Sequence, residues 1–253
     1  MKETLSKIYS VLIINLRKVT LSISGYYGFI VDYINLKKKD ESKRFKFSIK
    51  DLYPCVKDKT VTTEFEPHYT YHPAWAARVL SKTKPKFHID ISSTLHFCSI
   101  VSAFVPVKFY DYRPAKLKLS NLDTYKCDLN KLPFKTGSIE SISCMHTIEH
   151  VGLGRYGDEI DPEGDLKAIR ELIRVLALNG NLLIVVPIGR SKLAFNAHRI
   201  YSINQIREYF SGLELIEFSL LPDNYQLGLI KNPSDSFCNK QNWGCGCFWF
   251  KKT

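Results

Sequence analysis

The segment Asn181–Ile188, NLLIVVPI, is the feature that most limits how this chain can fold. It is apolar from Leu182 onward and rich in valine and isoleucine, which is typical of a strand buried on both faces of a parallel sheet. The segment before it, 166–178, places apolar residues at helical spacing, and we expect Gly180 to form the C-terminal cap of that helix. A helix that leads into a buried strand predicts a sheet covered by helices.

Segments of strand type and helix type alternate along the rest of the chain. WAARVL (75–80) and LHFCSIVSAF (95–104) suit helices, whereas FHIDIS (87–92) and VKFYDY (107–112) suit strands. The remaining elements are expected at 124–128 (strand), 138–148 (strand), about 202–210 (helix) and in the two closing strands LELIEFSLL and GCGCFWFKK. This order predicts an α/β fold: a doubly wound, mostly parallel sheet with an antiparallel C-terminal edge hairpin.

The positive charge of the chain is concentrated at its start. The net charge is +11, and residues 1–60 hold 13 Lys+Arg against 6 Asp+Glu, so +7 of the +11 lies there. A nucleic-acid enzyme more often spreads its basic residues around the site, so no nucleic-acid partner is expected. We interpret residues 1–62 as a basic extension, helical or irregular, and 63–253 as the α/β domain.

The extension contains the apolar and aromatic stretch 8–39, interrupted by Arg17 and Lys18. Neither half reaches the ~20 residues of a membrane span, and the order of charges does not fit a cleavable signal. We expect an amphipathic arm that packs on its own domain, on a second copy in a homodimer, or on an anionic membrane surface.

The seven cysteines are scattered along the chain and odd in number. Without a secretory leader they indicate a reduced, cytoplasmic protein, with the arm allowing a place at the inner face of the membrane. Cys245 and Cys247 alternate in a strand and should share one face. Two thiols alone make a poor zinc site, so we interpret both as core residues and expect no metal.

Four strings together resemble the Rossmann-like S-adenosylmethionine-dependent methyltransferases over about 86–221. They are HIDIS, FYDYRP, CDLNKLPFKTGSIESISCMHTIEHV and IRELIRVLALNGNLLIVVPIG. The strings GLGRYGDEIDPEGD and FNAHRIYS resemble a divergent bacterial subgroup of undetermined function associated with surface-polysaccharide genes. The resemblance implies a methyltransferase that uses S-adenosylmethionine to methylate a glycan or nucleotide-linked sugar in polysaccharide biosynthesis.

The resemblance also assigns residues to the cofactor, at the carboxyl ends of the strands. Asp111 would take the ribose hydroxyls, and a carboxylate there can accept two hydrogen bonds from a vicinal diol. The other implied cofactor residues are Asp90, Ser92, Asp128, Leu129, Met145 and His146. One departure is that 90–95 holds no glycine, whereas this turn is usually glycine-rich. A domain that keeps the fold without the cofactor is therefore an alternative.

The loop 152–165 holds four glycines and five carboxylates and leaves the expected carboxyl end of the fourth strand. The segment FNAHRIYS follows the fifth strand, so we expect it to lie at the same edge of the sheet, beside this loop. We predict His150 or His198 as general base, with Asp158 orienting it or binding substrate hydroxyls. The residues predicted to bind substrate are Arg155, Tyr156, Asp161, Asn196, Arg199, His68 and Tyr69.

Structural roles are open for several of these residues. Glu163 and Asp165 can favour the start of a helix, Arg155 and Asp158 can form an ion pair, and His146 can be a core residue. HTIEH also matches a zinc-peptidase pattern, but that chemistry needs a helix, and here a strand leads into the motif. A sugar-modifying transferase that does not use S-adenosylmethionine, and a non-catalytic assembly protein, are the alternative functions.

Overall fold

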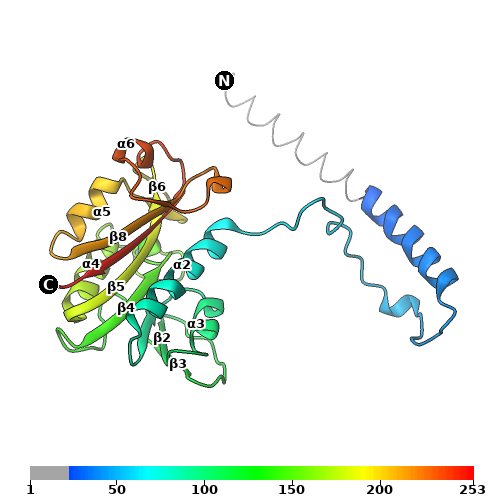
Figure 1. The fold of residues 1–253 in the computed structure, drawn as a ribbon, viewed down its shortest axis with the longest axis horizontal. Coiled ribbons are helices and arrows are strands. Elements are labelled where there is room, and N and C mark those ends of the chain that lie inside the picture. Colours follow the sequence, from blue (N-terminus) through cyan, green and yellow to red (C-terminus); the bar gives the residue numbers. More distant parts are fainter. Residues whose placement is uncertain (1–22) are drawn as a thin grey trace. The chain divides into compact units, whose positions relative to one another are not determined.

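A computed structural model describes residues 23–253, which belong to two units that divide after Phe65 (Figure 1). The described part of the first unit holds a helix over residues 23–39 and a single turn, η1 (Ile49–Asp51). Residues 1–22 of the predicted arm lie outside the described residues. From residue 23 on, no helix is both long and apolar enough to cross a membrane.

The second unit, Glu66–Thr253, is built on one eight-stranded sheet with the order β3-β2-β1-β4-β5-β10-β8-β9. The first five strands pair in parallel, while β10 is antiparallel to both β5 and β8. The bounds are β1 (His88–Ile91), β2 (Val107–Asp111), β3 (Leu122–Lys126), β4 (Ile139–Met145), β5 (Leu176–Ile188), β8 (Glu214–Leu221), β9 (Ile230–Lys231) and β10 (Gly244–Lys251). The predicted fold class is confirmed, with the refinement that the last strand enters the sheet between β5 and β8.

Helices cover both faces of this sheet, because β5 is apolar on both sides. Leu182, Ile184 and Val186 pack in one core with α4 (Gly164–Val175) and α5 (Ile203–Tyr209). Leu183 and Val185 pack in a second core with α2 (Pro67–Thr83) and α3 (Leu95–Val101). The interpretation of NLLIVVPI as a doubly buried strand is therefore confirmed.

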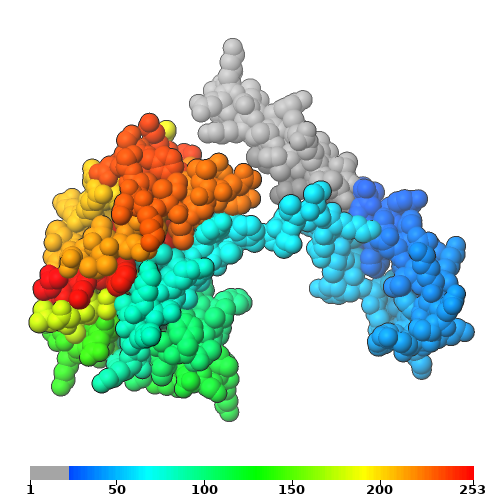
Figure 2. Space-filling view, viewed as in Figure 1, coloured from blue at the N-terminus to red at the C-terminus, as the bar shows by residue number. Residues whose placement is uncertain are grey.

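The C-terminal part of the chain lies against α2. In the space-filling view α2 (cyan) adjoins the orange residues that precede β10 (Figure 2). The stretch between β8 and β10 also contains a single turn, η3 (Tyr225–Leu227), and a short helix, α6 (Asp235–Cys238), which contacts α5. A two-stranded hairpin that the sequence did not predict, β6 (Lys192–Ala194) with β7 (His198–Ile200), follows β5.

The prediction that Gly180 caps a helix is wrong. Helix α4 ends at Val175, where the N–H of Leu176 bonds to Leu172, and β5 then runs through Gly180. A Cβ at Gly180 would lie 2.9 Å from the carbonyl oxygen of Ile139 on the neighbouring strand. Glycine is therefore needed at this position because two backbones approach each other closely, and not because a helix ends there.

The turn after β1 is made without glycine. Ser92 adopts the left-handed conformation, with φ of 55°, which costs an L-residue roughly 1–2 kcal/mol. Its N–H donates to the Tyr110 carbonyl at 2.8 Å, and its own carbonyl accepts from the Thr147 hydroxyl at 3.0 Å. These bonds to β2 and to the turn after β4 hold the conformation that glycine would adopt more readily.

We expect Ser92→Val to lower the free energy of unfolding by about 1–2 kcal/mol relative to Ser92→Asn, because β-branched residues tolerate positive φ poorly and asparagine tolerates it well. Urea denaturation of the two variants measures the difference. Equal stability would contradict the strain at this turn.

Candidate functional site

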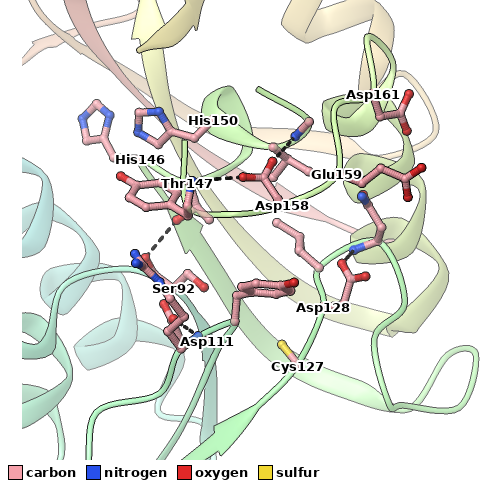
Figure 3. Close-up of a pocket in the computed structure, with 17 residues that line it drawn as sticks. Ser92, Asp111, Cys127, Asp128, His146, Thr147, His150, Asp158, Glu159 and Asp161 are labelled. Carbon is pink, nitrogen blue, oxygen red and sulfur yellow. Dashed lines mark hydrogen bonds between the residues drawn. The ribbon is translucent and has the colours of Figure 1, made fainter. Parts of the chain in front are cut away.

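A cavity of about 440 Å³ opens where the carboxyl ends of β1, β2 and β4 meet (Figure 3). Its walls come from the turn after β1, the end of β2, the segment after β3 and the loop after β4. This is the edge at which doubly wound sheets bind ligands. The residues predicted from the sequence that line it are Ser92, Asp111, Asp128, Leu129, His146, His150, Tyr156, Asp158 and Asp161.

Two carboxylates lie on the strand side of the cavity. Asp111, the last residue of β2, accepts the N–H of Arg113 at 2.6 Å through Oδ1, and Asp128 accepts the N–H of Asn130 at 2.8 Å through Oδ1. In each case one oxygen fixes the local turn, and the other makes no further hydrogen bond to the described residues. Both carboxylates can therefore accept hydrogen bonds from a ligand beside the buried Leu129.

Asp90 lies behind the cavity wall and not on it. Its side chain is fully buried and accepts hydrogen bonds from the Ser93 N–H, at 3.0 Å, and from the Ser143 hydroxyl. Burial raises its pKa to about 6, although these hydrogen bonds act in the opposite direction. Met145 packs in the core with α2. Neither Asp90 nor Met145 lines the cavity, and their assignment to the cofactor stays a prediction.

His146 lines the cavity but directs its nitrogens elsewhere. It follows β4 with φ of 54°, its Nδ1 donates to Glu149 Oε1 at 2.9 Å, and its Nε2 lies 3.4 Å from Cys245 Sγ. The ring can contact a ligand through its edge or face. Its two nitrogens instead contact the buried side chains of Glu149 and Cys245, which do not line the cavity.

The side chain of Asp158 fixes the conformation of the glycine-rich loop after β4. That carboxylate accepts the backbone N–H groups of Gly152 at 2.8 Å, Tyr156 at 3.1 Å and Gly154 at 3.4 Å. Partial burial opposes ionisation, but these bonds prevail and lower the pKa of Asp158. Asp158 therefore holds the loop, and the expected contact with a histidine or with Arg155 is not what the structure shows.

Of the two predicted bases, only His150 reaches the cavity. Its Nδ1 donates to the carbonyl of Ala197 at 2.5 Å, so in the neutral ring the proton lies on Nδ1. Its Nε2 then carries the lone pair and lies 3.9 Å from Glu149 Oε1. The ring of His198 is 6.2 Å from that of His150, on β7, and is not part of the cavity wall. Partial burial lowers the pKa of His198.

The two predicted substrate arginines are engaged with the backbone. Arg155 donates to the Ala197 carbonyl at 3.1 Å, while Arg199 donates to the Val151 carbonyl at 2.7 Å and pairs with Asp165 at 3.5 Å. Neither lines the cavity. They tie the glycine-rich loop to β7 and its preceding turn, which is a structural use of charge that the sequence did not distinguish from substrate binding.

The remaining loop residues have mixed placements. Asp161 lines the cavity and pairs with Lys167 at 2.5 Å. Tyr156 lines it with its ring 4.9 Å from the guanidinium carbon of Arg113. Asn196 lies in the β6–β7 turn, away from the cavity. Glu163 is the N-cap residue of α4, but its side chain makes no capping hydrogen bond.

His68 and Tyr69, on α2, do not line the cavity. Tyr69 is half exposed, and its ring lies 5.6 Å from that of His146. His68 is buried, with its ring 4.3 Å from Trp243 and stacked at 5.4 Å on His146. Sequence reasoning considered Cys245 and the HTIEH motif separately and did not predict that they meet; it missed Trp243. The spacing of His68 and His72, which puts both on one face of a helix, was a further signal.

Comparison with known proteins identifies the fold. The 1,6-didemethyltoxoflavin-N1-methyltransferase of Burkholderia thailandensis, solved with 1,6-didemethyltoxoflavin and S-adenosylhomocysteine, matches with a TM-score of 0.51 and 10% identity over 73% of this chain and 80% of that one. The YcgJ protein of Bacillus subtilis matches with a TM-score of 0.47 and 17% identity over 71% and 98%. The fold is that of the S-adenosylmethionine-dependent methyltransferases. At these identities the likeness concerns fold alone.

Sequence comparison adds a family without an assigned function. Residues 116–227 are similar to the family described as "Caenorhabditis protein of unknown function, DUF268". No protein with a curated description matches the chain. The family's description names neither bacteria nor polysaccharides, so the association with surface-polysaccharide genes stays a prediction.

The buried Asp90 predicts a pH dependence of stability. Because its pKa is raised to about 6, the folded state binds this proton more tightly than the unfolded state, and stability falls as pH rises from about 4 to about 6. We expect the unfolding free energy of the wild type minus that of Asp90→Asn to fall by up to about 3 kcal/mol across this window. His88, whose pKa burial lowers to about 3, acts in the opposite direction in both proteins. A pH-independent difference would contradict the assignment.

The glycine-rich loop supplies a matched pair of variants. Gly152 and Gly157 have φ of 79° and 82°, but an added Cβ would lie 2.1 Å from the Asp161 carbonyl oxygen at Gly152 and in open space at Gly157. We expect Gly157→Ala to cost about 1 kcal/mol of stability and Gly152→Ala at least about 2 kcal/mol more. Chemical denaturation measures both. Equal losses would show that the loop does not pack as described.

Proposed function

We propose that this protein transfers a methyl group from S-adenosylmethionine to a hydroxyl group. The observation that carries the proposal is the position of Asp111. On this fold it ends β2 at the cavity, and one carboxylate oxygen makes no hydrogen bond to residues 23–253. A vicinal diol such as ribose can donate two hydrogen bonds to a carboxylate in this position. Asp128 and Leu129 stand next to it and offer a polar and an apolar contact for the adenine.

The charge of the cavity fits the cofactor. Its lining holds the carboxylates of Asp111, Asp128, Asp158, Glu159 and Asp161, and a single arginine, Arg113. S-adenosylmethionine carries a sulfonium, an ammonium and a carboxylate group, so its net charge is positive, and a wall with an excess of carboxylates attracts such a ligand. The glycine-less turn does not close the site, because Ser92 adopts the glycine conformation and its small side chain lines the cavity.

When bound, the cofactor supplies an electrophilic methyl group. The chain must then orient the acceptor and receive the proton that the hydroxyl loses. His150 is our choice for this role, since the residue lines the cavity and the bond from Nδ1 to the Ala197 carbonyl leaves Nε2 as the proton acceptor of the neutral ring. Asp158 contributes indirectly, because it holds the loop whose residues line the cavity next to His150.

For the acceptor we propose a glycan hydroxyl, in polysaccharide biosynthesis. A nucleotide-linked sugar fits less well, because its diphosphate would meet a carboxylate-rich wall while Arg155 and Arg199 are committed to backbone carbonyls. A sugar-modifying transferase that does not use S-adenosylmethionine is the second candidate. The absence of glycine at 90–95 favours it, and cofactor binding separates the two.

We expect S-adenosylhomocysteine to bind the wild-type protein, and Asp111→Ala to weaken binding by about 2 kcal/mol, roughly thirtyfold in Kd, through loss of charge-assisted hydrogen bonds. Isothermal titration calorimetry measures both. The matched control is Asp123→Ala, which removes the same charge from an exposed position on β3 and should leave Kd unchanged. Absence of binding by the wild type would remove the methyltransferase proposal in favour of the second candidate.

A further inference from the structure

A cluster of metal-ligating side chains lies beside the cavity wall, in a part of the molecule that the proposed reaction does not use. His68 from α2, His146 after β4 and Cys245 from β10 are all buried, and one donor atom from each lies within 4.8 Å of the other two. We propose that these three residues bind a zinc ion. The two imidazoles and one thiolate are the nitrogen and sulfur donors that zinc prefers.

The spacing of the donors suits the ion. Zinc bonds of about 2.0–2.1 Å to nitrogen and about 2.3 Å to sulfur, at a tetrahedral angle, separate the two ligand atoms by roughly 3.5 Å. Cys245 Sγ and His146 Nε2 are 3.4 Å apart. This donor pair therefore already has the separation that two ligands of one zinc ion require.

His146 is oriented as a metal ligand by its outer partner. Its Nδ1 donates to Glu149 Oε1 at 2.9 Å, and both side chains are buried. In the neutral ring this bond places the proton on Nδ1 and leaves the lone pair on Nε2, which faces the thiol. A carboxylate behind a histidine ligand is the usual support of a zinc site.

Two further nitrogens of the cluster have no partner. His68 Nδ1 and His72 Nε2 are buried and make no hydrogen bond to the described residues. A buried polar atom without a partner costs about 1–3 kcal/mol. An S–H···N bond between Cys245 and His146 would explain those two residues but would leave both of these nitrogens unsatisfied. An ion held by His68 Nδ1 would satisfy the first. The ring of His72, one helical turn further along α2, lies 5.1 Å from that of His146.

This site differs from the one that HTIEH suggests. The peptidase pattern would use His146 and His150 on one helix face, but Ile148–His150 forms only a single turn, and His150 bonds to Ala197 instead. The ligands proposed here come from three distant parts of the chain. Zinc would join α2, the turn after β4 and β10, and so fix the cavity wall that His146 forms.

The experiment is metal binding by the whole chain, measured without S-adenosylmethionine. The protein is stripped with a chelator, kept reduced, and titrated with Zn²⁺ in competition with a chromophoric chelator. We expect one ion per chain. Cys245→Ser and His68→Asn should each weaken binding by more than 100-fold, beyond the roughly 10- to 100-fold that loss of an outer partner costs, which is the range expected for Glu149→Gln.

The matched control is Cys238→Ser, which removes another buried thiol outside the cluster and should bind zinc like the wild type. Co²⁺ provides a second readout, because a thiolate ligand gives charge-transfer absorption that should be present in Cys238→Ser and absent in Cys245→Ser. Circular dichroism of the metal-free variants checks folding, and the wild-type Co²⁺ spectrum decides the question where a variant does not fold. Equal zinc affinity of Cys245→Ser and Cys238→Ser, or a Co²⁺ spectrum of the wild type without thiolate absorption, would overturn the proposal.

Discussion

The parallel pairing of β1 with both β2 and β4 is the constraint on which the candidate site depends. The register sets Asp90 opposite Phe109 on one side and Ser143 on the other, so all three strands end at the same edge. Ser92, Asp111 and His146 meet there although they are far apart in the sequence. The bonds from Ser92 to Tyr110 and from Thr147 to Ser92 then lock the three strand ends into one wall.

The loop after β4 completes the site, and some of its carboxylates stabilise the loop itself. Its carboxylates do not all face a ligand: Asp158 gathers three backbone N–H groups and Asp161 pairs with Lys167. The glycines supply the left-handed conformations and the close backbone approach that this closure requires. A junction rich in glycine and carboxylates is thus a rigid wall whose remaining charge favours a cationic ligand.

Sequence patterns predicted the fold well, because the continuous apolar run of β5 and the helical spacing of apolar residues in α4 are strong and distinct signals. They predicted less of the site. Asp111 could be placed at a strand end, whereas the roles of Asp90 and Arg199 depend on partners in Ser143 and Val151 that only the folded chain brings near. The meeting of Cys245 with His146 was beyond sequence reasoning, since it depends on the last strand entering the sheet beside β5.

A crystal structure grown with S-adenosylhomocysteine tests the central claim most directly. Our account predicts the nucleoside in the cavity, with both ribose hydroxyls on the Asp111 carboxylate and the adenine beside Leu129. A nucleoside bound elsewhere, or a cavity closed by its own side chains with Asp111 turned away, would contradict it.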